Sequence, residues 1–126
     1  MFRLLMLMAL ATAAYAQPGR AWIVLGQTHV DGSIDHDRIA VNGRPDEFRG
    51  LRLLVQNNGI RFDRVLVRFR DGSSMPWHVR GHMASGSQSR VLDVPPRRAI
   101  DFVEFWYERG NWRNPRRPRL TLFGLR

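Results

Sequence analysis

Cysteine and lysine are both absent from this chain of 126 residues. The lack of cysteine excludes disulfides, thiolate metal sites and cysteine nucleophiles, so the fold must be held together by packing or by a metal bound through other side chains. The lack of lysine means that all 20 basic residues are arginine, against 11 acidic residues, for a formal net charge of +9. Such a charge attracts polyanions over long distances. Because genome base composition also produces an arginine bias, the charge alone does not assign a partner.

Long apolar runs are absent too, except at the start of the chain. There Arg3 precedes the apolar run Leu4–Ala13, and Ala14–Ala16 has the A-x-A pattern of a signal-peptidase site. We therefore expect residues 1–16 to be a signal peptide cleaved after Ala16, leaving a single domain over residues 17–126. The mature chain has no run of ~20 apolar residues that could span a bilayer. We expect it to be periplasmic or secreted.

Helical periodicity is missing from the rest of the chain, where short apolar runs alternate with turn residues, as is typical of an all-β domain. The segment Ala21–His29 is apolar on both parities for most of its length, which predicts a strand buried on two sides. A short strand follows at Ile39–Val41. The segment Leu51–Phe69 predicts a hairpin that turns with positive φ at Asn58–Gly59. Its alternation changes parity at Asp63–Arg64, which predicts a β-bulge.

The second half of the chain continues this pattern. Asp71–Gly72 predicts a second hairpin, leading into Met75–Val79, whose proline suits an edge strand. Ser89–Val94 is expected to be a short strand, Ala99–Glu108 a long central one, and Arg119–Leu125 the last. Seven or eight short strands without crossover helices favour a single antiparallel β-sandwich, with a small barrel as the alternative.

Several of these segments together carry a family resemblance. They are Trp22–Gly26, Asp35–Ile39, Ser89–Asp93, Arg98–Ile100 and Phe105–Tyr107. In this pattern the chain resembles a family of short exported bacterial proteins of unknown function. The resemblance implies a β-sandwich-like fold and export, and it implies no activity, cofactor or catalytic residue.

The most distinctive segment is the loop over residues 109–119, which carries five arginines around Trp112. Arginine forks bind phosphate or carboxylate bidentately, and an exposed tryptophan can stack on a planar ligand or enter a membrane interface. The alternative is a solvated connector whose Trp112 folds back onto the core. The candidate anion-binding residues are Arg97, Arg98, Arg109, Trp112, Arg113, Arg116, Arg117 and Arg119.

An acidic loop offers a candidate metal site, because Asp31, Asp35 and Asp37 surround Ser33. Oxygen ligands on a flexible turn suit Ca²⁺, although the full ligand pattern of an EF-hand and its closing glutamate are missing. Aspartate and serine are also ordinary turn residues, and an Asp–Arg salt bridge would equally account for them.

Other chemistry has weaker support. His78 and His82 share one face of an extended strand near Met75 and Met83, which would suit copper, but no third firm ligand accompanies them. The chain has no G-x-S-x-G, Walker or dinucleotide-binding motif.

The composition therefore favours a non-enzymatic cationic binding module of the cell envelope. Its expected partner is an anionic envelope component or an acidic protein rather than nucleic acid. The alternative is a divalent-metal-binding domain of the Ca²⁺ type, and outside that alternative no cofactor is expected.

Overall fold

The computed structural model describes residues 21–32, 34–79, 81–110, 112 and 116–126. These residues form nine strands and no helix. The strands are β1 (Trp22–His29), β2 (His36–Ala40), β3 (Gly50–Gln56), β4 (Ile60–Phe69), β5 (Ser74–Pro76), β6 (His82–Met83), β7 (Leu92–Asp93), β8 (Ile100–Tyr107) and β9 (Arg119–Leu125).

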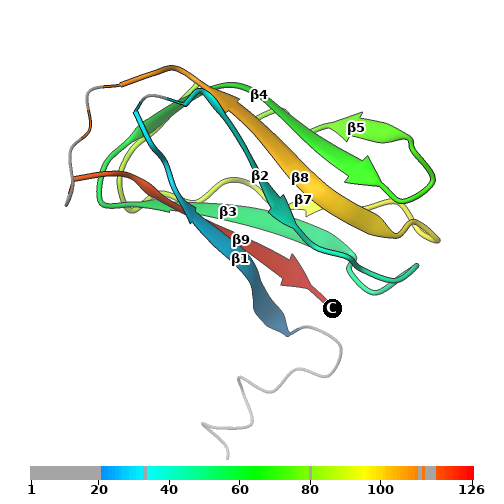
Figure 1. Cartoon of the computed structure of the whole chain (residues 1–126). Helices are drawn as coiled ribbons and strands as arrows, with labels where there is room; N and C mark the ends of the chain where they lie inside the picture. Colours follow the sequence, from blue (N-terminus) through cyan, green and yellow to red (C-terminus); the bar gives the residue numbers. More distant parts are fainter. Residues whose placement is uncertain (1–20, 33, 80, 111, 113–115) are drawn as a thin grey trace, which may run out of the picture.

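The strands lie in two antiparallel sheets that face each other, as Figure 1 shows. Sheet A has the order β1-β9-β3-β7, and sheet B has the order β2-β8-β4-β5, with the short β6 also pairing with β4. Both sheets are open, so the described strands make a β-sandwich rather than a closed barrel. The long strand expected at Ala99–Glu108 is β8, which is central in sheet B, and the last strand has the expected bounds.

The core lies between the two sheets, where alternate residues of each strand point inward. Sheet A contributes Leu51, Leu53 and Val55 from β3 together with Leu120 and Leu122 from β9, all fully buried. Sheet B contributes its own alternating set from β4 and β8, which is Ile60, Phe62, Val65, Val67, Val103, Phe105 and Tyr107. Removal of this apolar area from water is the main stabilising term of the fold.

Two local predictions for β4 are confirmed. The register of β4 against β8 shifts between Phe62 and Arg64, which is the expected bulge, and it returns Val65 and Val67 to the core side. The hairpin to β5 forms through a turn in which Gly72 has a φ of 92°, and β5 lies at the edge of sheet B. Only glycine adopts that backbone conformation without strain.

The expected hairpin over Leu51–Phe69 is wrong. β3 and β4 have about the predicted bounds, but β3 pairs in sheet A and β4 in sheet B, so the connection crosses from one sheet to the other. The positive φ, 72°, occurs at Asn57 rather than at Asn58 or Gly59. A turn signal marks a reversal of the chain, but it does not determine which strands pair on either side of the turn.

The expected burial of the first strand on both sides is also wrong. β1 is an edge strand of sheet A, and its outward side chains Trp22 and Val24 are 38% and 56% exposed. Its apolar residues therefore lie partly on the outer face of sheet A and partly against the core. The strand expected at Ser89–Val94 shortens to β7, in which Leu92 and Asp93 pair with β3, while the Ser89 N–H also donates to the Leu53 carbonyl of β3.

No helix in the described part of the chain is long and apolar enough to cross a membrane.

Candidate anion-binding face

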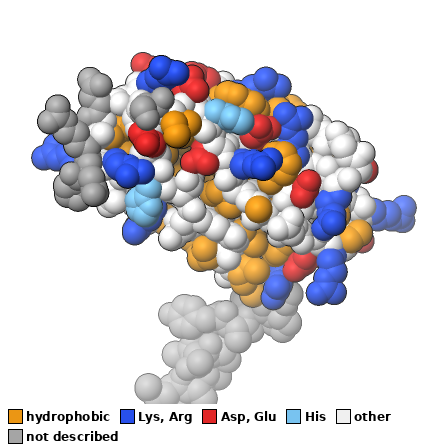
Figure 2. Space-filling view, viewed as in Figure 1, with side chains coloured by type: hydrophobic (Ala, Val, Ile, Leu, Met, Phe, Trp, Pro, Cys, Tyr) orange, Lys and Arg blue, Asp and Glu red, His pale blue; other side chains and the backbone are white. Residues whose placement is uncertain are grey.

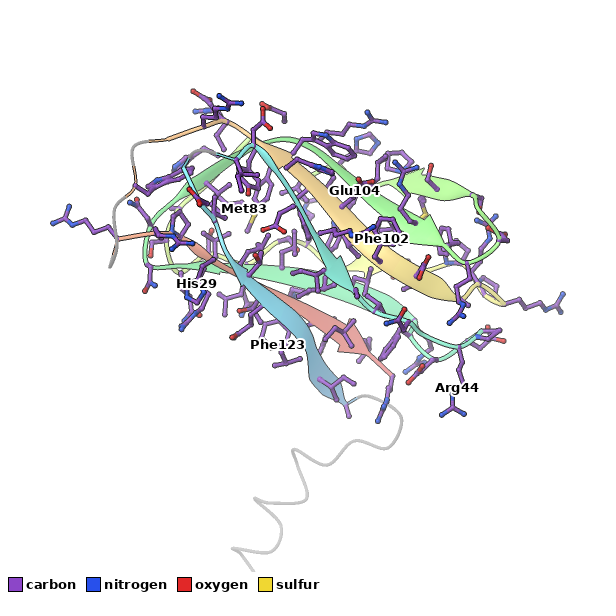
Figure 3. The ribbon with its side chains drawn as sticks, viewed as in Figure 1. His29, Arg44, Met83, Phe102, Glu104 and Phe123 are labelled. Atoms are coloured by element: carbon purple, nitrogen blue, oxygen red, sulfur yellow. The ribbon has the colours of Figure 1, made fainter. Side chains whose placement is uncertain are left out.

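The outer face of sheet B carries a connected set of aromatic and charged side chains. Because Val103, Phe105 and Tyr107 of β8 point into the core, Phe102 and the alternating residues after it point outward. β2 lies on one side of β8 and β4 on the other, so each outward residue of β8 has neighbours from two strands. Figure 3 labels Glu104 on this side of the molecule and Phe123 on the opposite side, below sheet A.

One row of this face consists of His36, Trp106 and Arg64, which are directly opposite one another in the register. The His36 and Trp106 rings are stacked, with centroids 4.7 Å apart, and the Arg64 guanidinium lies 4.9 Å from the centre of the Trp106 ring. Since β8 runs between β2 and β4, the imidazole and the guanidinium approach the indole from opposite sides. Both faces of Trp106 are therefore covered, and its edge is directed outward.

Glu104 is the centre of the face, and its carboxylate is held from two sides. His36 Nε2 lies 2.6 Å from Glu104 Oε2, and Arg68 Nε donates to Glu104 Oε1 at 2.8 Å. The Glu104 side chain is only 12% exposed although it lies on an outer face. Burial opposes its ionisation, but the hydrogen bonds from Arg68 and His36 outweigh this effect and lower the pKa of the Glu104 carboxyl below its ordinary value.

Two arginines of the face have no carboxylate partner among the described residues. The Arg38 guanidinium lies 4.8 Å from the centre of the Phe102 ring, and Arg64 lies over Trp106. A guanidinium that stacks on an aromatic ring keeps its N–H groups available to a ligand, because they point outward within the plane of the guanidinium. From the register, the two Cα atoms are ~12 Å apart. Figure 2 shows arginine, acidic and hydrophobic side chains interleaved along the upper side of the molecule, above sheet B.

The face ends in a cleft of about 400 Å³ at the edge where β5 stops. Its lining includes Asp63 and Arg64 at the bulge of β4, Pro76 of β5, and His78. The cleft gives the sheet a concave margin next to Arg64.

The sequence alone does not predict this face. In the sequence, His36 falls within the segment expected to be an acidic loop, and Glu104 fits the polar face of the strand expected at Ala99–Glu108. The alternation of Phe102, Glu104 and Trp106 in a central strand was the available signal, but the partners come from β2 and β4, and their register is not readable from the sequence.

Three of the five arginines expected to bind anions over residues 109–119 have side-chain partners within the protein. Arg109 Nε lies 3.7 Å from Asp35 Oδ2, Arg117 Nε donates to the Val30 carbonyl at 3.4 Å, and a terminal nitrogen of Arg119 donates to Gln56 Oε1 at 2.8 Å. Arg116 is exposed, and its carbonyl accepts a hydrogen bond from Asn58. Arg113 lies outside the described residues.

Trp112 is half-buried and packs against the hydrophobic core, which corresponds to the connector interpretation of the loop. Gly110 makes room for it, because a Cβ there would lie 2.7 Å from the indole ring.

Arg97 and Arg98 lie at the other end of the sandwich from this loop, since they precede β8 and the loop follows it (Figure 1). The eight residues of β8 separate the two groups by ~26 Å. Arg97 donates its backbone N–H to Asp46, and Arg98 donates to Ser73 Oγ at 3.0 Å and lies over the Phe69 ring. The candidate residues therefore do not form one site.

The acidic loop is also engaged in local contacts. Thr28 Oγ1 donates to Asp37 Oδ2 at 2.6 Å, and Asp35 is paired with Arg109. Burial raises the pKa of Tyr107 to about 12, and the nearby carboxylates of Asp37, Asp31 and Asp35 add to that rise. Ser33 lies outside the described residues, and the others include no group of three histidine or acidic side chains placed to hold a metal ion. Calcium binding at this loop stays a prediction.

Comparison with known proteins gives the following similarities. No protein of curated function matches the sequence. A mutant of a family 29 carbohydrate-binding module is similar in structure, with a TM-score of 0.42 and 16% identity over 86% of this chain and 82% of that one. The SPBc2 prophage-derived protein YomS has a TM-score of 0.45 and 7% identity over 85% and 93%. A family 29 module from Piromyces equi has a TM-score of 0.39 and 12% identity over 84% and 90%.

One family model matches residues 2–124, which is nearly the whole sequence. The chain therefore belongs to the family described as the domain of unknown function DUF2541.

Proposed function

We propose that this protein is a non-enzymatic binding module that holds an anionic partner against the outer face of sheet B. The observation that carries the proposal is the placement of Arg38 and Arg64, which lie on aromatic rings and have no carboxylate partner among the described residues. An arginine in this state offers its planar fork to carboxylate, sulfate or phosphate.

The aromatic contacts favour binding because they restrict the arginines before a ligand arrives. A long side chain that is ordered on binding costs about 0.5–1.5 kcal/mol of conformational free energy. Stacking on Phe102 and Trp106 orders Arg38 and Arg64 in the unbound protein, so less of this cost falls on the binding step.

The state of Glu104 favours binding over chemistry. Its two oxygens are occupied by Arg68 and His36, and these contacts keep the carboxyl ionised. A general acid needs the opposite, a carboxyl whose pKa is raised toward neutrality. The role that fits Glu104 is to fix His36 and Arg68 in position and to neutralise part of the positive charge of the face.

The covered faces of Trp106 favour ionic recognition over ring stacking. A ligand that stacked on this indole would first have to displace His36 or Arg64. The groups that meet a partner are therefore the arginine forks. We propose that the partner is an anionic envelope component or an acidic protein, met after export and removal of residues 1–16.

The test measures binding of dextran sulfate, with uncharged dextran as the ligand control, at several salt concentrations. We expect binding of the sulfated polymer only, weakening as salt screens the charges. The double variant R38A/R64A should lose at least tenfold in affinity. The control R44A/R70A removes the same charge from two exposed arginines elsewhere, and it should retain most of the binding.

Two results would overturn the proposal. An equal loss in both double variants would mean that net charge alone drives binding. A loss confined to R116A/R117A would place the site on the loop before β9 instead of on sheet B.

Export is tested separately by expressing the full chain in a Gram-negative host and sequencing the N-terminus of the protein in the periplasmic fraction. We expect a chain that begins at Gln17. An unprocessed chain in the cytoplasm would contradict the signal peptide.

A further inference from the structure

A second cleft, of about 370 Å³, opens on the side of the sandwich away from β1 and β2. One wall of the cleft is formed by residues 77–79 and β6. The other wall is formed by the loop that leads from β6 to β7. Its volume is within the range of small-molecule pockets, ~300–1,000 Å³, near the lower limit.

The lining combines an apolar part with a polar rim. Trp77 and Met83 line the cleft and are both members of the hydrophobic core, being 5% and 7% exposed. His78, His82 and Arg90 are exposed residues around them. An apolar surface with a few convergent polar groups is the usual composition of a ligand site.

Some polar groups of the lining already form hydrogen bonds within the protein, and others do not. Ser87 Oγ donates to the Ala84 carbonyl at 2.6 Å, and Ser89 Oγ donates to the Arg90 carbonyl and accepts the Leu53 N–H, both at 2.9 Å. These hydroxyls support the loop. By contrast, the side chains of His78, His82 and Arg90 make no hydrogen bond or ion pair with any other residue that the structure describes.

The position of His82 depends on the connection between the two sheets. A Cβ on Gly59 would lie 2.6 Å from His82 Nε2 and 3.0 Å from its Cε1. Glycine at this position is therefore what allows the imidazole to lie at the cleft wall. Any larger residue would force the ring away.

The charge of the lining selects the ligand class. Arg90 is permanently cationic and the two imidazoles can donate hydrogen bonds, while no acidic residue lines this cleft in the described part of the chain. Two histidines without a third nitrogen or carboxylate ligand fall short of a metal site. From these observations we infer that the cleft binds a small organic anion, whose carboxylate or phosphate meets Arg90 and the histidines and whose apolar body lies against Trp77 and Met83.

The test uses benzoate and phenyl phosphate as anionic probes and benzyl alcohol as an uncharged probe of similar shape. Binding is followed through carbon-13-labelled methionine methyl groups. Met83 lines the cleft, whereas Met75 of β5 lines neither of the two clefts described, so it serves as an internal control. We expect saturable shifts of the Met83 signal with the anions, at least tenfold weaker binding of benzyl alcohol, and little change at Met75. A preference between the two anions identifies the carboxylate or the phosphate as the natural headgroup.

Variants complete the test. R90A and H82A should each weaken benzoate binding about tenfold, because each removes a side chain that donates a hydrogen bond to the charged group of the ligand. The control R116A removes an exposed arginine outside the cleft and should bind as the parent protein does. R38A/R64A should also bind benzoate normally, which separates this site from the face on sheet B. Absence of a saturable Met83 shift at millimolar probe, or equal binding of benzyl alcohol, would overturn the inference.

Discussion

Glu104 shows at the scale of one residue how an outward-facing position becomes buried. Its neighbours in β8 on the same face are the large rings of Phe102 and Trp106, and its partners come from β2 and β4. The carboxylate therefore has little contact with water, and its charge is balanced by Arg68 and His36 instead. A carboxylate held in this way stabilises the fold only while it is ionised.

The first prediction concerns this carboxylate. We expect E104Q to lower the free energy of unfolding by about 1–3 kcal/mol at pH 7, because the charge beside Arg68 is left uncompensated. The folded-state pKa of Glu104 lies below its ordinary value of 4.5, so its stabilising contribution is present above that pH and is lost as the pH falls through the folded-state pKa. Urea unfolding of parent and variant should therefore differ at pH 7 and converge in acid.

The matched control is E108Q, which removes an exposed carboxylate in a weaker pair with Arg61. We expect it to change stability by less than about 0.5 kcal/mol. A difference between the parent protein and E104Q that did not depend on pH would show that the carboxylate is not held in its charged form.

Asn57 is a second position at which the type of side chain should affect stability. Its φ of 72° is in the left-handed region, which asparagine tolerates and β-branched residues do not. We expect N57G to unfold at nearly the same urea concentration as the parent protein and N57V to lose about 1–2 kcal/mol. Equal stability of the two variants would contradict a requirement for this backbone conformation at the crossing between the sheets.

At the scale of elements, the acidic loop before β2 carries the calcium hypothesis for Asp31, Asp35 and Asp37. The measurement is thermal unfolding of chelator-treated protein with and without Ca²⁺. Free Ca²⁺ at a concentration one hundred times the Kd of the site would add about 2.7 kcal/mol to the free energy of unfolding. A site would show this as an upward shift of the midpoint that D35A abolishes. Without a shift, the role of these carboxylates is in the turn and in local contacts, which include those with Thr28, the Arg38 N–H and Arg109.

The loop before β9 is expected to contribute to stability through the packing of Trp112 against the core. Because Trp112 lies against the core, W112A should lower the free energy of unfolding by about 1–3 kcal/mol. R116A alters only an exposed side chain and should stay within about 0.5 kcal/mol of the parent protein. Denaturant unfolding of both variants tests this, and an unchanged W112A would mean that the indole does not contribute to the core.

At the scale of the whole molecule, the net charge of +9 affects stability and binding in opposite directions. Self-repulsion among arginines opposes the compact state, and salt screens it. We therefore expect the thermal midpoint to rise by a few degrees as salt is added from low ionic strength to ~0.15 M, where the Debye length is ~8 Å. Over the same range the affinity for dextran sulfate should fall. A midpoint that fell with salt would mean that the ion pairs outweigh the repulsion.

The sequence by itself determined the all-β class and the main strands. Alternation and turn residues located β8 and β9, the bulge near Asp63 and the hairpin at Gly72, because each of these depends on residues close together in the chain. The composition also determined the cationic character. The connection at Asn57 was misread as a hairpin because a local turn looks the same whether the next strand pairs beside the last one or in the opposite sheet.

Only the tertiary structure decided which charged side chains meet. Arg38, His36, Arg64 and Glu104 belong to three strands, and their contacts depend on the order and register of β2, β8 and β4. The same arrangement separated Arg98 from the loop before β9, by placing them at opposite ends of β8. Strand pairing joins residues far apart in the chain through backbone hydrogen bonds that any sequence can make, so the side chains along one strand do not specify which strands become its neighbours.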